Sequence, residues 1–140
     1  MLWSTKIEKH LKKFVSQLRN YYLCSNVSKL EHFEIEFLPE ALEFLSNIPV
    51  KAREKILFNM GLAKSRKDPK LFEPLQYGVW YFRTKYFGNQ YRIFAFWDKT
   101  EKTNTLVIAT HGIIKKSDKP SKSEILKAKA IKDKYFESKM

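Results

Sequence analysis

Two arginines stand on neighbouring predicted strands, at positions where a sheet brings their side chains to one side. Arg83 lies in Val79–Phe87, a segment rich in aromatic and β-branched residues, and Arg92 lies in the next apolar segment, Tyr91–Trp97. Side chains alternate across a strand, and an unpaired guanidinium is costly inside an apolar core. We therefore expect both arginines to point away from any covering helix. Paired guanidinium groups suit phosphate, with cross-strand surface pairing to acids as the alternative.

A histidine and two lysines follow on the third predicted strand, which we expect over Thr103–Ile114. His111 can accept or donate a proton near neutral pH, and Lys115 and Lys116 fall near the strand end as point charges. Together with tyrosines near the same sheet face, these residues suit a phosphate and an unpaired base. Structural roles stay open, because His111 can hydrogen-bond in a turn before Gly112 and the lysines can be solvated.

The alternation places two phenylalanines beside the charged residues. Phe94 and Phe96 fall on the same side as Arg92. They either stack on bases or belong to a strand that is bulged and partly covered. The opposite side carries the residues that we expect in the core, which are Trp80, Phe82, Ile93, Val107 and Ala109.

The remaining segments predict the elements that position these residues. A half-buried strand is expected over His32–Phe37, where apolar and acidic residues alternate. The segment Asp68–Gly78 is rich in Pro and Gly and predicts a loop. Ser121 and Glu124 have the spacing of a capping box at a helix start. From apolar residues at helical spacing, helices are predicted over Glu40–Asn47, Val50–Arg66 and Ser121–Glu137.

The order of strand, two helices, three strands and helix predicts an α+β fold. A mostly antiparallel sheet would carry the helices on one face, and the other face would be open to solvent or ligand. We expect Gly88-Asn89 to be the tight turn between the first two strands of the three. Lys6–Leu18 predicts a basic amphipathic helix, so we divide the chain into an N-terminal extension, 1–30, and a domain, 31–140.

The composition favours a polyanionic partner and disfavours several other classes. The 140 residues include 27 Lys and Arg against 15 Asp and Glu, a formal net charge of +12, which attracts nucleic acid, ribosomes or anionic membranes unless it serves only solubility. Cys24 is the only cysteine, so an internal disulfide is excluded and zinc is disfavoured. With no bilayer-length apolar run and no signal-peptide pattern, we expect a cytoplasmic protein without metal or other cofactor.

Several motifs in this order resemble the RelE/ParE toxin superfamily, in particular its HigB-like, phage-related branch. They are Glu73-Pro74-Leu75, Trp80-Tyr81-Phe82-Arg83, Tyr91-Arg92-Ile93, Thr110-His111-Gly112-Ile113-Ile114-Lys115-Lys116 and, in the closing helix, Glu124-Ile125-Leu126-Lys127-Ala128. The resemblance covers about Phe33 to Phe136. It implies a RelE-like order of elements, β-α-α-β-β-β-α.

The resemblance also implies a metal-independent endoribonuclease that cleaves messenger RNA, usually in the ribosomal A site, and so inhibits translation. Attack by a ribose 2′-OH on the adjacent phosphate needs a base, an acid and cations. Carried onto this sequence, Arg92 is the first candidate for transition-state stabilisation, Arg83 is the second phosphate ligand, and His111 is the candidate for proton transfer. The candidates for RNA contact are Lys85, Lys115, Lys116, Tyr81 and Tyr91.

The partners implied by the resemblance are messenger RNA, the ribosome and a cognate antitoxin, expected to be a helix-turn-helix protein; no membrane is implied. Two other functions stay open. A ParE-like protein would inhibit DNA gyrase by binding alone, and a non-toxic domain would only bind nucleic acid. Every version that binds nucleic acid should lose affinity as salt rises, because phosphate contacts release counterions.

Overall fold

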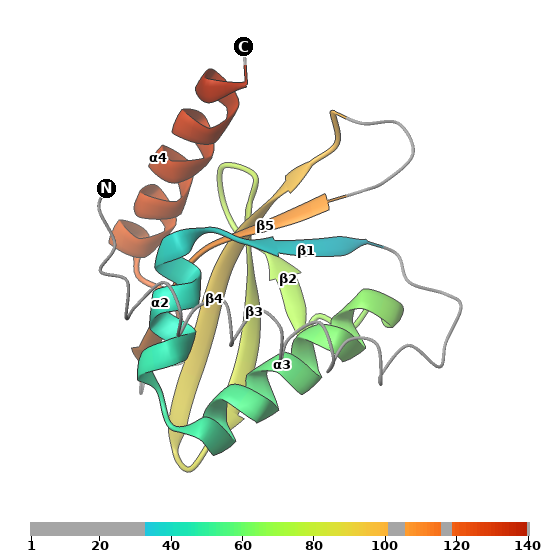
Figure 1. Cartoon of the computed structure of the whole chain (residues 1–140), viewed down its shortest axis with the longest axis vertical. Helices are drawn as coiled ribbons and strands as arrows, with labels where there is room; N and C mark the ends of the chain where they lie inside the picture. Colours follow the sequence, from blue (N-terminus) through green and yellow to red (C-terminus); the bar gives the residue numbers. More distant parts are fainter. Residues whose placement is uncertain (1–32, 101–105, 116–118, 140) are drawn as a thin grey trace, which may run out of the picture.

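The computed structural model describes residues 33–100, 106–115 and 119–139, in which five strands form one mixed sheet (Figure 1). The described elements are β1 (Glu34–Phe37), α2 (Pro39–Asn47), α3 (Val50–Ser65), β2 (Phe72–Pro74), β3 (Val79–Tyr86), β4 (Asn89–Asp98), β5 (Leu106–Lys115) and α4 (Lys122–Ser138). The sheet order is β1-β5-β4-β3-β2, with β1 parallel to β5 and the other pairs antiparallel. The predicted α+β class is confirmed. The predicted extension 1–30, its helix Lys6–Leu18, and Lys116 lie outside the described residues.

The β3–β4 hairpin sets the positions of the two arginines. Its two turn residues, Phe87 and Gly88, both have positive φ, 47° and 75°. A type I′ turn requires this backbone at both positions, which glycine adopts readily and phenylalanine does not. The prediction of Gly88-Asn89 as the turn was therefore wrong by one residue. The resulting register places Arg83 directly across from Arg92.

Strand β2 lies within Asp68–Gly78, the segment predicted as a loop, so that prediction was wrong in part. The strand has only three residues and ends at Pro74, which has no N–H and is suited to a sheet edge. It pairs with the first half of β3, and its last link is a hydrogen bond from Arg83 N to Leu71 O at 2.9 Å. The second half of β3 therefore continues past the end of its outer neighbour.

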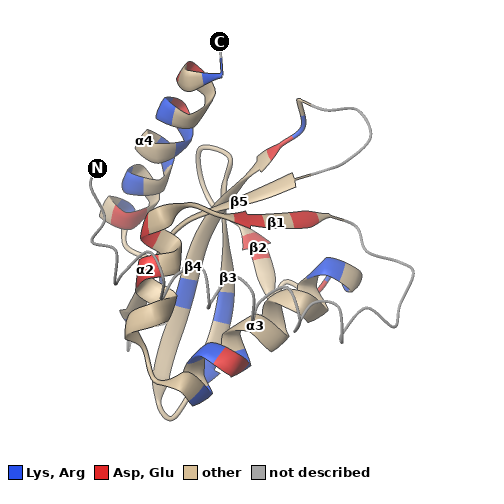
Figure 2. Cartoon of the chain, in the orientation of Figure 1, with Lys and Arg blue, Asp and Glu red and all other residues tan. Residues whose placement is uncertain are grey.

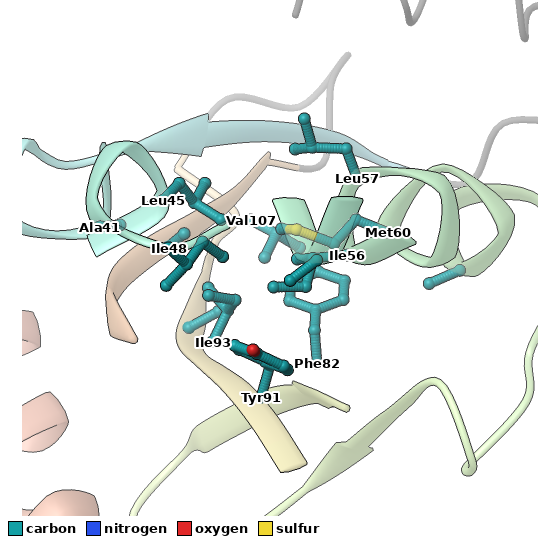
Figure 3. Close-up of a cluster of buried hydrophobic side chains, with 14 of the residues drawn as sticks. Ala41, Leu45, Ile48, Ile56, Leu57, Met60, Phe82, Tyr91, Ile93 and Val107 are labelled. Carbon is teal, nitrogen blue, oxygen red and sulfur yellow. The ribbon is translucent and has the colours of Figure 1, made fainter. Parts of the chain in front are cut away.

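Helices α2 and α3 cover one face of the sheet and bury the larger core cluster. Figure 3 shows side chains from both helices meeting side chains of β3, β4 and β5. The labelled members include Leu45, Ile56, Met60, Phe82, Ile93 and Val107, all buried. Neither helix has a side-chain cap at its N-terminus. The burial of their apolar side chains against the sheet is therefore the main contribution to the stability of the two helices. Of the residues predicted as core, only Trp80 is partly exposed.

Helix α4 packs on the other face of the sheet, against β3, β4 and β5. The prediction that the helices leave one face open was therefore wrong. Phe94 and Phe96, which alternation places beside Arg92, are fully buried beneath this helix. The ladder between β4 and β5 shifts register between Phe94 and Ala95. The bulged, covered strand was thus the right one of the two alternatives for these phenylalanines.

Both ends of α4 are anchored to the sheet. At the start, Ser121 is the N-cap and its hydroxyl accepts from Glu124 N at 3.4 Å, as the capping-box spacing predicts. At the end, the buried Asp98 accepts hydrogen bonds from Tyr135 Oη and Lys139 Nζ, each at 2.6 Å. Burial alone would raise the pKa of Asp98, but these bonds and those from Thr100 hold it well below its usual range. Asp98 therefore stays ionised at neutral pH.

Candidate nucleic-acid interface

The two arginines lie on the sheet face that α4 covers in part, and they share contacts. Figure 2 shows the blue positions of β3 and β4 side by side, as the pairing of Arg83 with Arg92 requires. The ring of Tyr81 lies 5.7 Å from the Arg83 guanidinium carbon and 5.8 Å from that of Arg92. Arg83 Nη1 also lies 3.4 Å from Glu73 Oε1. One aromatic ring and one carboxylate therefore hold two like charges close together.

Arg92 and Arg83 differ in how far solvent reaches them. Arg92 is 1% exposed, and its guanidinium donates to Lys119 O at 3.0 Å and to Gln90 Oε1 at 3.1 Å. The Arg83 side chain is 29% exposed. A phosphate arriving from solvent would contact Arg83 first. The surface pairing with an acid that the sequence left open does occur for Arg83, with Glu73, and it leaves the side chain partly accessible.

A basic pocket of about 460 Å³ opens at the far end of the β3–β4 hairpin. The residues that line it are Asn59, Lys70, Leu71, Arg83, Thr84, Lys85, Gln90, Tyr91 and Arg92. This described lining has four cationic side chains and no carboxylate, so the pocket attracts anions. Lys70 was missed by sequence reasoning, because it lies in the predicted loop and only the three-dimensional fold brings it beside Arg83.

His111 lies on the same face as the arginines but beneath α4, where it is 1% exposed. Its Nε2 is 2.8 Å from Glu124 Oε2, its Nδ1 is 3.0 Å from Thr110 Oγ1, and its ring stacks on Phe94 at 4.8 Å. Burial lowers the pKa of His111 despite the opposing effect of Glu124. A neutral ring with its proton on Nε2 donates to Glu124, and its Nδ1 then shares the single proton of the Thr110 hydroxyl with Phe94 O, which lies 3.2 Å from that hydroxyl. The expectation that the imidazole shares an open surface with the arginines was wrong, because α4 covers it.

The other predicted contact residues are divided between surface and core. Lys85 is exposed and lines the basic pocket, and Lys115 lies across from Gln90 at the end of β5. Tyr81 and Tyr91 are 2% and 3% exposed. Neither tyrosine therefore presents a ring face to solvent, and the expectation of base stacking on them was wrong.

Residues 43–133 match the family model described as "Phage derived protein Gp49-like (DUF891)". The chain belongs to this family. The Gp49-like family is associated with toxin–antitoxin systems and is related to RelE/HigB-type toxins, which confirms the predicted relationship at that level; the HigB-like branch stays a prediction. No curated protein and no solved structure matches the chain.

The matched residues of this Gp49-like chain run from α2 to α4 and contain the whole basic pocket. They also contain the buried His111 and its partner Glu124. None of the helices in the described ranges has both the length and the apolar character that crossing a membrane requires.

Glu73 is a further polar residue in contact with Arg83, to which the sequence assigned no role. It lies across from Tyr81 in the β2–β3 ladder, and Tyr81 Oη donates to Glu73 Oε1 at 2.6 Å. Burial and the bond to Glu73 raise the pKa of Tyr81 to about 12, so the phenol stays protonated. The only sequence signal was the quoted motif Glu73-Pro74-Leu75. Its significance depends on an edge strand that the sequence does not predict.

Proposed function

We propose that this Gp49-like protein is the toxin of a toxin–antitoxin system and cleaves messenger RNA at the basic pocket. The observation that carries the proposal is the pocket itself, in which Arg83, Arg92, Lys70 and Lys85 line one cavity. Guanidinium groups bind phosphate through paired N–H donors, and ammonium groups add positive charge around it. Such a site suits a phosphodiester whose negative charge increases during reaction.

The proposed reaction is internal transesterification of RNA. The ribose 2′-oxygen attacks the adjacent phosphorus, the bond from phosphorus to the 5′-oxygen breaks, and the products are a 2′,3′-cyclic phosphate and a 5′-hydroxyl end. Arg83 contacts the non-bridging oxygens directly. Arg92, held by Gln90 and Lys119, supplies a fixed positive charge behind them. A preorganised charge of this kind lowers the barrier because it needs no rearrangement as the phosphorane forms.

Two proton transfers complete the reaction. The Glu73 carboxylate, in contact with Arg83, takes the proton of the 2′-hydroxyl, and the ammonium group of Lys85 or Lys70 gives a proton to the leaving 5′-oxygen. Glu73 is favoured over His111 as the base because its side chain is 29% exposed, whereas the imidazole lies under α4. For His111 to act, the first turn of α4 would have to leave the sheet.

The antitoxin and the ribosome are the proposed partners of this function. A partner that neutralises the toxin needs only to present carboxylates to the four cations of the pocket and to exclude the RNA phosphate. Messenger RNA positioned by the ribosome supplies a strand whose bases are unpaired and whose phosphates can reach the pocket. The proposed site of action is therefore the translating ribosome in the cytoplasm.

Primer extension on a translated messenger RNA, with the purified protein added to a translation extract, tests the proposal. We expect new 5′ ends with the wild-type protein and cleavage about 100-fold slower with Arg83→Gln, because a donor to the developing charge is lost. Arg83→Lys should fall between them, since it keeps the charge but not the paired donors. Lys134→Gln, which removes one exposed charge on α4, is the matched control and should cleave normally.

The assignment of the base is tested by two further variants in the same extract. Glu73→Gln should lose cleavage with its fold intact, and His111→Gln should retain cleavage when its lower stability is allowed for. If the wild-type protein stops the growth of cells that express it but leaves their transcripts intact, the nuclease proposal is contradicted. DNA breakage with intact transcripts would indicate gyrase inhibition instead.

A further inference from the structure

A second cavity lies at the C-terminal end of α3, beside the strands β2, β3 and β4. Its volume is about 690 Å³, within the range of small-ligand sites. Four aromatic side chains line it, which are Phe33, Phe72, Trp80 and Trp97. The two indole rings lie 5.6 Å apart with their planes at 81°, and Phe72 contacts both, at 4.9 and 5.8 Å. Two flat walls at a steep angle suit a planar ring that stacks on one indole and meets the edge of the other.

The rim of this aromatic pocket is positively charged. Its charged lining residues are Arg66, Lys67, Asp68, Lys99 and Lys132, four cations and one carboxylate. Lys99 Nζ lies 5.3 Å from the centre of the Trp97 ring, so one cation already lies beside an indole wall. An apolar floor under a cationic rim suits a ligand that is aromatic at its centre and anionic at its ends.

We propose that the aromatic pocket binds an unpaired nucleobase of RNA, with the flanking phosphates held by the cationic rim. The proposal rests on the proposed function only in taking RNA as the ligand. Bases stack on tryptophan irrespective of sequence, and cations around the stack bind the backbone. The chain's own residues 1–32 complement the rim poorly, because they carry six Lys or Arg against two Glu. An acidic peptide complements the charge of the rim, but its carboxylate side chains do not stack on the two indole rings.

The two pockets adjoin each other, which favours one RNA strand as the ligand of both. Consecutive residues divide between them, since Pro69 lines the aromatic pocket and Lys70 lines the basic pocket. Arg83 and Trp80 lie on opposite faces of β3, so a strand with its phosphate at Arg83 would pass around the sheet edge at β2 before one of its bases stacks against the Trp80 or Trp97 indole. The aromatic pocket then selects or orients the base near the cleavage point.

Tryptophan fluorescence tests the proposal directly, because two of the three tryptophans line the pocket. The full chain, with Trp3→Phe to remove the third signal, is titrated with a hexauridylate carrying 2′-O-methyl groups, which cannot be cleaved. We expect saturable quenching. Lys99→Glu or Arg66→Glu should weaken binding and so raise the half-saturation concentration at least 10-fold. Lys51→Glu makes the same charge change about 22 Å from Arg66 along α3. It should raise the half-saturation concentration no more than about twofold.

The outcomes separate this proposal from the proposed nuclease function. Quenching that survives Arg83→Gln, while cleavage is lost, supports a base site distinct from the phosphate site. Normal cleavage without quenching overturns the aromatic pocket and leaves the nuclease standing, whereas quenching without cleavage does the reverse. Equal weakening by Lys51→Glu and Lys99→Glu overturns the pocket as well. Quenching by a glutamate-rich peptide containing phenylalanine, but not by RNA, would assign the pocket to a protein partner instead.

Discussion

Replacing His111 with alanine tests whether this imidazole is part of the core or part of the chemistry. The substitution removes a buried ring stacked on Phe94 and two hydrogen bonds, to Thr110 and Glu124. Truncating a buried aromatic side chain costs about 3–5 kcal/mol, and a lost hydrogen bond costs about 1 kcal/mol. The Glu124 side chain is 25% exposed, so water can replace its lost partner and the lower part of the range applies. We expect a loss of about 4 kcal/mol in the free energy of unfolding.

The pH dependence of stability gives a second measure of the same residue. Burial lowers the pKa of His111 in the folded state, whereas the unfolded chain has the ordinary value near 6.5. The contribution of the neutral ring is therefore complete above about pH 6.5 and is lost as the pH falls through that value towards the folded pKa, by up to about 1.4 kcal/mol per pH unit. The side chain of His111→Gln cannot titrate. The difference in the free energy of unfolding between wild type and this variant therefore separates the contribution of His111 from that of the other histidines.

Urea denaturation followed by circular dichroism at several pH values from 8 to 5 measures both effects. At pH 8, His111→Ala should unfold at a urea concentration about 2 M lower than wild type, for a slope of about 2 kcal/mol per M. Asp98 does not interfere in this range, because its pKa is held far below it. An unchanged stability of His111→Ala would contradict a core role for this imidazole. Acidification that stabilises the wild-type protein relative to His111→Gln would contradict it as well, since that would mean an imidazolium paired with Glu124.

Three further predictions follow from packing and charge. Asp98→Asn should lose about 2 kcal/mol of stability, because Tyr135 and Lys139 lose a charged acceptor; Lys139 is 43% exposed and adds little. Since the folded pKa of Asp98 is depressed, its contribution is present above about pH 4 and lost at lower pH, so acid unfolding should be less steep in this variant. Gly112→Ala should lose about 1–3 kcal/mol by thermal denaturation, because a Cβ would overlap the Phe44 ring. Finally, the logarithm of RNA affinity should fall linearly with the logarithm of salt concentration, and Arg83→Gln should reduce that slope by about 1 if Arg83 contacts a phosphate.

The hairpin and its arginines were predictable because the information is local. The apolar alternation of β3 and β4, joined by a two-residue turn, decides which side chains share a face. The predicted turn would have placed Lys85 rather than Arg83 across from Arg92, but a shift of two residues keeps every side chain on its face, so both arginines still share one side of the hairpin. The parity of each strand is set by its own residues, and no distant contact is needed to establish it.

The coverage of the sheet was not predictable in the same way. The apolar stripe of α4, with Ile125 and Ala128 buried, shows that the helix packs on something but does not say which sheet face receives it. Long-range contacts decide that, and they move His111 from a surface site into the core. The edge strand β2 was missed for a related reason, because three residues ending in proline carry too little local pattern to indicate a strand.

The extent of α4 determines which part of this sheet face is covered and which part is open to a ligand. The helix covers the sheet from Phe96 to His111, where its contacts are apolar or directed at Glu124. Arg92 marks the boundary, since its guanidinium is buried against Lys119, three residues before the helix begins. Beyond it the hairpin continues past the end of β2, and Lys85 there is exposed and lines the basic pocket. Under the proposed function, a substrate phosphate would approach this part of the face. Side chains under α4 would then support the reaction through the stability of the fold, and His111 would do so by holding the first turn of α4 through Glu124.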